Sequence, residues 1–70
     1  MLKIKKGIYR HYKGQEYEVI EAARHSETLQ DLVIYRALYG DYELWVRPLQ
    51  MFLEELEVEG QIKKRFQFLK

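Results

Sequence analysis

Apolar and polar residues alternate over several short stretches of the chain, and this is the pattern of half-buried β-strands. Residues 8–12 and 17–23 alternate on either side of Gly14, so they predict a β-hairpin with Gly14 in its turn. The longer apolar run at 32–39 predicts a central strand, and residues 42–47 predict the strand that returns beside it.

The period of the pattern changes after Pro48. Apolar residues then recur at helical spacing, at Leu49, Phe52, Leu53 and Leu56. This spacing predicts one short helix within residues 48–56, with Pro48 at its first position.

The remaining segments predict a loop, a hairpin and a last strand. The polar segment 25–31 predicts a loop, with one helical turn near 28–32 as the alternative. Glu59-Gly60 marks a hairpin turn, and the alternation of residues 65–69 predicts the last strand.

Together these elements predict a single all-β domain over residues 1–70 with one short helix, folded as a small SH3-like antiparallel barrel or a rolled sheet. A chain of 70 residues buries only roughly 60% of its extended surface, so the core is small. The residues expected in the core are Ile8, Val19, Val33, Tyr35, Leu44, Val46, Phe52, Phe66 and Phe68.

Composition removes several classes of protein. Without Cys there is no disulfide and no thiolate metal site, and no apolar run approaches the ~20 residues of a membrane span. The basic start of the chain lacks the apolar stretch of a signal peptide, so we expect a cytoplasmic protein. The four Gly are isolated, which gives no phosphate loop, and we expect no cofactor.

Charge is sorted along the chain although the net charge is only +1. Residues 1–13 hold five cationic residues and residues 61–70 hold four, and neither segment has an acid. The middle carries all eleven acids against three Arg. If the first and last strands are neighbours, the two ends form one patch for an anionic partner; otherwise the charges simply pair between strands and along solvated faces.

Aromatic and cationic side chains are interleaved on the predicted strands. The candidate binding residues are Tyr9, Arg10, Tyr12, Lys13, Arg36, Trp45, Arg47 and Arg65. On an open face, rings and cations of this kind hold single-stranded nucleic acid, so nucleic acid or a nucleic-acid-associated protein is the predicted partner. Two alternatives stay open: the rings belong to the core with Arg stems lying over them, or they form an aromatic groove of a protein–protein adaptor or a homodimer.

A third alternative is a small metal-binding protein or enzyme that uses His11, His25 and Glu27. These side chains are the right types for a zinc site, but no motif brings three ligands together. Ser26 is the only Ser, and nothing in the spacing aligns it with a base. We therefore predict a binding module with no catalytic or metal site.

Six short strings of the sequence carry a family resemblance. They are Gly7–Gly14, Tyr17–Val19, His25–Thr28, Val33–Tyr35, Leu44–Pro48 and Met51-Phe52. In this order they resemble a bacterial family known as domain of unknown function 1653, over about residues 7–68. The resemblance implies a compact β-rich domain, bacterial or phage-borne and often standing alone, and it implies no activity or cofactor. The chain has Glu59-Gly60 where the family pattern would have Asp-Gly.

Overall fold

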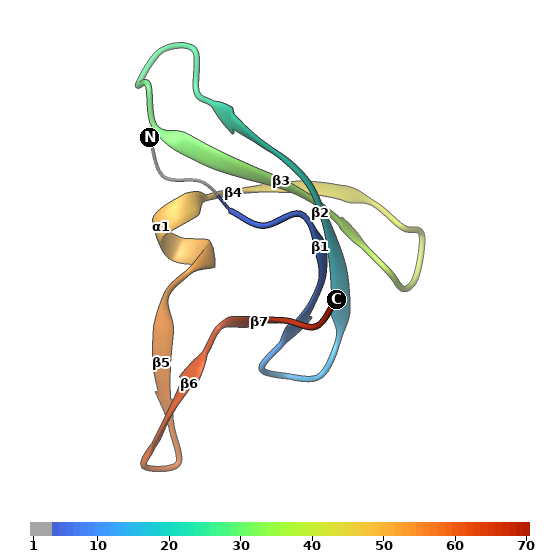
Figure 1. The fold of residues 1–70 in the computed structure, drawn as a ribbon, viewed down its shortest axis with the longest axis vertical. Helices are drawn as coiled ribbons and strands as arrows, with labels where there is room; N and C mark the ends of the chain where they lie inside the picture. The colour runs from blue at the N-terminus through green and yellow to red at the C-terminus, as the bar shows by residue number, and fades with distance from the viewer. Residues whose placement is uncertain (1–3) are drawn as a thin grey trace.

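The computed structural model describes residues 4–70, which form seven strands and one short helix (Figure 1). The elements are β1 (Gly7–His11), β2 (Glu16–Arg24), β3 (Asp31–Ala37), β4 (Leu44–Pro48), α1 (Leu49–Phe52), β5 (Glu55–Val58), β6 (Gln61–Lys64) and β7 (Phe66–Phe68). Five strands pair antiparallel in the order β4-β3-β2-β1-β7, and β5 and β6 form a separate hairpin. The prediction of an all-β fold with one short helix is confirmed, and the sheets are not closed into a barrel.

The tight turns use residues that reach positive φ. Gly14 lies in the turn between β1 and β2 at φ 107°, a region that L side chains rarely adopt. Glu59 and Gly60 are the two residues between β5 and β6, with φ of 52° and 80°. Positive φ at both central residues is the geometry of a type I′ hairpin turn, so the predicted hairpin forms although Glu is a poor residue for its first position.

The first and last strands are neighbours. β1 and β7 pair in the register Tyr9↔Phe68 and His11↔Phe66, and Ile8 N–H donates to the Lys70 carbonyl at 2.8 Å. The approach is close at Gly7, where a Cβ would lie 2.6 Å from that same carbonyl oxygen. The pairing brings the two acid-free segments of the chain together, within the residues that the structure describes.

The core is a cluster of aromatic rings between the sheet and α1. Phe52 of α1 stacks on Phe66 of β7, with ring centroids 4.0 Å apart and planes 1° apart. Tyr9 and Tyr35 meet Phe52 edge to face, at 5.3 and 5.4 Å between centroids. The buried cluster comprises Tyr9, Val19, Val33, Tyr35, Leu49, Phe52 and Phe66. It confirms five of the nine expected core residues, while Ile8 and Phe68 are partly buried.

The prediction that Leu44 and Val46 lie in the core is wrong: their side chains are 55% and 59% exposed. Trp45 stands opposite Tyr35 and Arg47 opposite Val33, so Trp45 and Arg47 share the core face of the sheet. Leu44 and Val46 therefore point to the other face. The first strand differs from the prediction in the same way, because Tyr9 and not Ile8 is the residue buried in the core.

The helix is shorter than the pattern predicts. α1 starts after Pro48 and ends at Phe52, and its two buried residues are Leu49 and Phe52. Leu53 is 49% exposed, and Leu56 belongs to β5 rather than to the helix. The apolar residues predicted at helical spacing therefore lie on a helix only in the first turn, because the chain then continues into the β5–β6 hairpin.

The β5–β6 hairpin extends away from the five-stranded sheet (Figure 1). Its base is closed by Arg65, whose N–H donates to the Glu54 carbonyl at 2.8 Å and whose guanidinium pairs with the Glu54 carboxylate at 3.3 Å. The Arg65 carbonyl accepts from Tyr12 N–H at 3.0 Å. Arg65 thus joins the hairpin to the end of β1.

Candidate nucleic-acid interface

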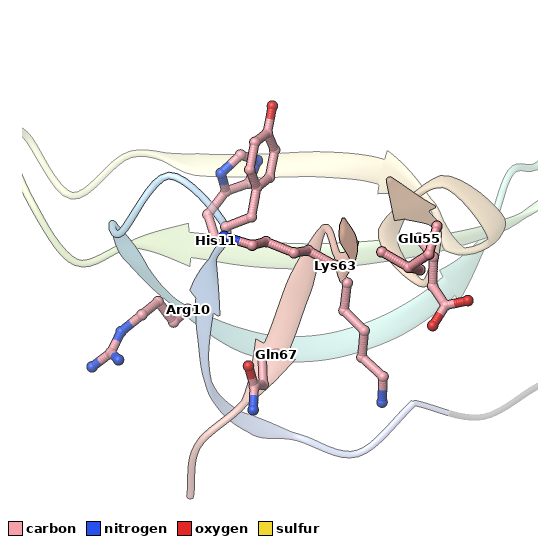
Figure 2. A pocket seen from close by; sticks show the side chains of 8 residues that line it. Arg10, His11, Glu55, Lys63 and Gln67 are labelled. Atoms are coloured by element: carbon pink, nitrogen blue, oxygen red, sulfur yellow. The ribbon is translucent and has the colours of Figure 1, made fainter. Parts of the chain in front are cut away.

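A cleft of about 540 Å³ lies between the β1–β7 edge of the sheet and the projecting hairpin. We call it the cationic cleft; it is lined by Arg10, His11, Tyr12, Glu55, Ile62, Lys63, Lys64 and Gln67. Figure 2 shows how β1 and β7 supply Arg10, His11 and Gln67, whereas the hairpin supplies Glu55 and Lys63. Among these lining residues Glu55 is the only acid.

The cations of the cleft differ in how far they are already neutralised. Arg10 pairs with Glu16, directly opposite it on β2, at 3.1 Å. Lys63 and Lys64 are exposed on β6 and form no ion pair with any residue between 4 and 70. The two lysines therefore carry the charge that is most available to an anionic ligand.

His11 forms the inner wall of the cleft. Its ring centroid lies 4.5 Å from that of Tyr12 and 4.9 Å from that of Phe66. Burial lowers the pKa of His11, and the charges of Arg65, Arg47 and Lys13 lower it further. The imidazole is therefore neutral at pH 7 and presents an aromatic face, not a cation.

A second concave surface lies on the core face near the β3–β4 end of the sheet. We call it the aromatic cup; it is lined by Tyr17, Tyr35, Tyr39, Trp45 and Arg47. Trp45 is 50% exposed, and Arg47 is held by its Nε–H, which donates to the Tyr35 hydroxyl at 3.3 Å. The guanidinium also lies over the Phe66 ring, 5.7 Å from its centroid.

Two tyrosines that line the cup are hydrogen-bonded to each other. The hydroxyls of Tyr17 and Tyr39 lie 2.7 Å apart. Burial, reinforced by this hydrogen bond, raises the pKa of Tyr17 to about 12, so its hydroxyl stays protonated at neutral pH. The Tyr17 ring is also 6.4 Å from the His11 ring, which makes His11 the link between the cup and the cationic cleft.

The structure brings some of the predicted binding residues together and separates others. Arg10 and Tyr12 line the cationic cleft, and Lys13 stands beside it with its ammonium 5.8 Å from the Tyr12 ring centroid. Trp45 and Arg47 line the aromatic cup. These five residues occupy two adjoining surfaces rather than one continuous face.

Three predicted residues lie outside both surfaces. Tyr9 is 6% exposed and its hydroxyl donates to the Lys5 carbonyl at 2.6 Å, so its ring offers no stacking platform. Arg36 lies on the opposite face of β3 and donates to the Tyr42 carbonyl at 2.8 Å. The Arg65 side chain is only 20% exposed and pairs with Glu54, so it closes the hairpin instead of facing the cleft.

The fold does not bring together the ligands that the alternative metal site would need, among the residues that the structure describes. Residues 4–70 contain no group of three or more His, Asp and Glu side chains arranged for a metal ion. His25 Nδ1 accepts from the backbone N–H groups of Glu27 and Thr28, at 3.1 and 3.3 Å, and so closes the loop between β2 and β3. Within the same residues no helix has the length and apolar character needed to cross a membrane.

The sequence reasoning missed several residues of the two surfaces. Lys63 and Lys64 were visible as part of the acid-free segment, but only the hairpin fold places them opposite β1. Tyr17, Tyr35 and Tyr39 come from β2, β3 and the following turn, and they meet only through strand pairing. No local sequence signal marks that cluster.

Comparison with known proteins gives one family. The family described as a protein of unknown function, DUF1653, matches residues 7–68. The crystal structure of a DUF1653 protein from Bordetella bronchiseptica is similar to this chain, with 31% sequence identity and a TM-score of 0.87. The similarity covers 94% of this chain and 87% of that one. No curated protein matches the chain.

Proposed function

Because this chain belongs to the DUF1653 family, whose description assigns no function, we propose one from the geometry of its two surfaces. The protein is a binding module for single-stranded nucleic acid. Phosphates lie along the cationic cleft and bases stack in the aromatic cup. The observation that carries the proposal is the convergence of the two acid-free ends of the chain on one cleft beside exposed rings.

The charge pattern favours a polyanion over a small anion. Lys63 and Lys64 on one wall and Arg10 on the other give the open cleft several separate cations instead of one enclosed anion site. Separate cations of this kind neutralise several phosphates and release their counterions, so binding weakens as salt rises.

The aromatic cup favours a single strand over a duplex. Trp45 and Tyr39 are 50% and 40% exposed, so their rings are open to an unpaired base. Bases stacked inside a duplex cannot reach such a surface, whereas stacking of a free base on an aromatic ring contributes about 1–3 kcal/mol. Arg47 at the edge of the cup adds a cation beside the stacked base.

The test is binding of fluorescent single-stranded DNA and RNA oligonucleotides, measured by anisotropy at several salt concentrations. The double variant Lys63→Ala, Lys64→Ala should bind more weakly and flatten the slope of log K against log salt by about 1.4, or about 0.7 for each lost phosphate contact. A charge-matched control, Arg24→Ala with Arg36→Ala, removes two cations that lie outside the cleft and outside the acid-free ends. Its binding and its slope should stay close to those of the unmodified protein.

A third variant separates stacking from charge. Trp45→Ala should lower the affinity and leave the salt slope unchanged, because it removes a ring and no cation. Absence of binding to every oligonucleotide at low salt would reject the proposal. An equal loss of slope in the control variant would show that net charge, not the cleft, is responsible.

A further inference from the structure

We infer that the outer edge of β4 is a homodimer interface, at which two copies of this chain pair antiparallel across a twofold axis beside Trp45. The pairing extends the five-stranded sheet into one continuous sheet across both copies. This inference concerns the backbone edge of β4 and is tested without nucleic acid, although Trp45 and Arg47 also line the aromatic cup.

The edge of β4 is open and apolar. β4 is the terminal strand of the sheet, and no strand within residues 4–70 pairs with its outer side. Leu44, Trp45 and Val46 are each at least half exposed. Soluble proteins normally protect such an edge with Lys, a bulge or a covering segment, and these three residues supply none of these.

The backbone of β4 has its free hydrogen-bonding groups in the right places. Ala37 N–H donates to the Glu43 carbonyl at 3.0 Å, so the pairs Ala37↔Glu43 and Tyr35↔Trp45 are the hydrogen-bonded pairs between β3 and β4. The residues between them, Leu44 and Val46, therefore turn their N–H and C=O groups outward.

The segment from Glu43 to Arg47 is complementary to itself. In an antiparallel pair centred on Trp45, Leu44 of each copy faces Val46 of the other, and these are the two residues with free amide groups. Trp45 faces its own copy as the close, non-hydrogen-bonded pair. Glu43 faces Arg47, which places opposite charges at both ends of the pairing.

The structure also limits the length of this pairing. Pro48 has no N–H to donate, and it occupies the next outward position beyond Val46. At the other end Tyr42 has φ 55°, which interrupts the extended backbone. Only the segment between Tyr42 and Pro48 can form the ladder of hydrogen bonds, and this fixes the register of the pairing.

The opposite edge of the sheet is a poorer candidate. β7 is only three residues long and lies between Arg65 and Lys70. Two copies pairing there would bring like charges together and would gain few hydrogen bonds. β4 is the edge that fits a second copy.

The test is the oligomeric state of the whole chain, measured by sedimentation velocity without nucleic acid from about 10 μM to about 1 mM. Val46→Pro removes an N–H that faces outward, so it leaves the β3–β4 ladder intact and should raise the dimer dissociation constant roughly tenfold or more. The matched control Val46→Thr keeps the β-branched shape and the N–H, and should still dimerise. Circular dichroism of each variant checks that the sheet is retained.

A charge reversal tests the register independently. Glu43→Arg should weaken the dimer, because it sets two cations against each other at both ends of the ladder. Glu43→Gln removes the charge without opposing Arg47, so it should weaken the dimer less than Glu43→Arg does. A wild-type chain that stays monomeric at about 1 mM, or a dimer unaffected by Val46→Pro and Glu43→Arg, would overturn the inference.

Discussion

Phe66 holds the core together from the last strand, and Phe66→Ala tests that role. The side chain is 5% exposed, its ring stacks on Phe52 at 4.0 Å, and it meets Tyr17 and Tyr35 edge to face at 5.5 and 5.7 Å. Truncating a buried Phe costs about 3–5 kcal/mol, and the stiff rings around this one cannot collapse into the cavity. We therefore expect a loss of about 4–5 kcal/mol.

This loss is large for so small a protein. At about 0.05–0.15 kcal/mol per residue, 70 residues give a total free energy of unfolding of about 3.5–10 kcal/mol. Phe66→Ala should therefore leave a large fraction of the chain unfolded at 25 °C without denaturant. Urea unfolding followed by circular dichroism measures the free energy for both proteins.

Two further variants keep the measurement interpretable. Phe66→Leu retains most of the volume and should cost about 1 kcal/mol, so its transition stays measurable even if Phe66→Ala is unfolded. Gln67→Ala, on the exposed side of the same strand, should change the stability by less than about 0.5 kcal/mol. A loss below about 1 kcal/mol for Phe66→Ala would refute the assignment of this ring to the core.

Three other changes have defined outcomes. Gly7→Ala should lower the free energy of unfolding, measured in urea, by more than Gly14→Ala does. Both glycines have positive φ, but only Gly7 is packed against other atoms, so equal losses would contradict the close approach at Gly7. The lowered pKa of His11 means that the unfolded chain takes up this proton at a higher pH than the folded chain, so stability falls as the pH drops below about 6.5. In His11→Gln the free energy of unfolding, measured in urea, should fall less between pH 7.5 and 5.5 than in the unmodified protein. An unchanged pH profile would show that His11 does not cause this loss of stability. Glu59→Asn should stabilise the hairpin, because Asn tolerates positive φ better than Glu, and hydrogen exchange of the hairpin amides should slow; faster exchange would show that the turn is not type I′.

The sequence identifies most of the strands but not which way each one faces. In Leu44-Trp45-Val46-Arg47, one face carries two aliphatic side chains and the other carries a ring and a cation. Apolarity alone selects the aliphatic pair for the core, whereas pairing with β3 turns Trp45 and Arg47 toward the core face of the sheet, at its partly exposed end. Arg47 is accommodated because its guanidinium bonds to Tyr35 and lies over the Phe66 ring. That arrangement depends on partners far away in the sequence.

Only part of the candidate site was predictable from the sequence. The merging of the two basic ends required only that β1 and β7 be neighbours, and their pairing is confirmed. The wall opposite β1 depends on the direction in which the hairpin projects, which the Arg65–Glu54 contacts fix at its base. Nothing local in the sequence indicates that Arg65, a candidate binding residue, forms an ion pair with Glu54 instead of facing the cleft.

The pairing of β1 with β7 also decides when this domain can fold during synthesis. Phe66 must reach Phe52 and Tyr35 before the ring cluster is complete, and Phe68 must reach Tyr9 before the sheet has its fifth strand. A ribosome that has released only β1 to β4 therefore exposes the edge of β1, which β7 covers in the complete domain. Closing a contact between residues so far apart in sequence is slow compared with forming a local hairpin, so we expect the sheet to be completed only after β7 has been released.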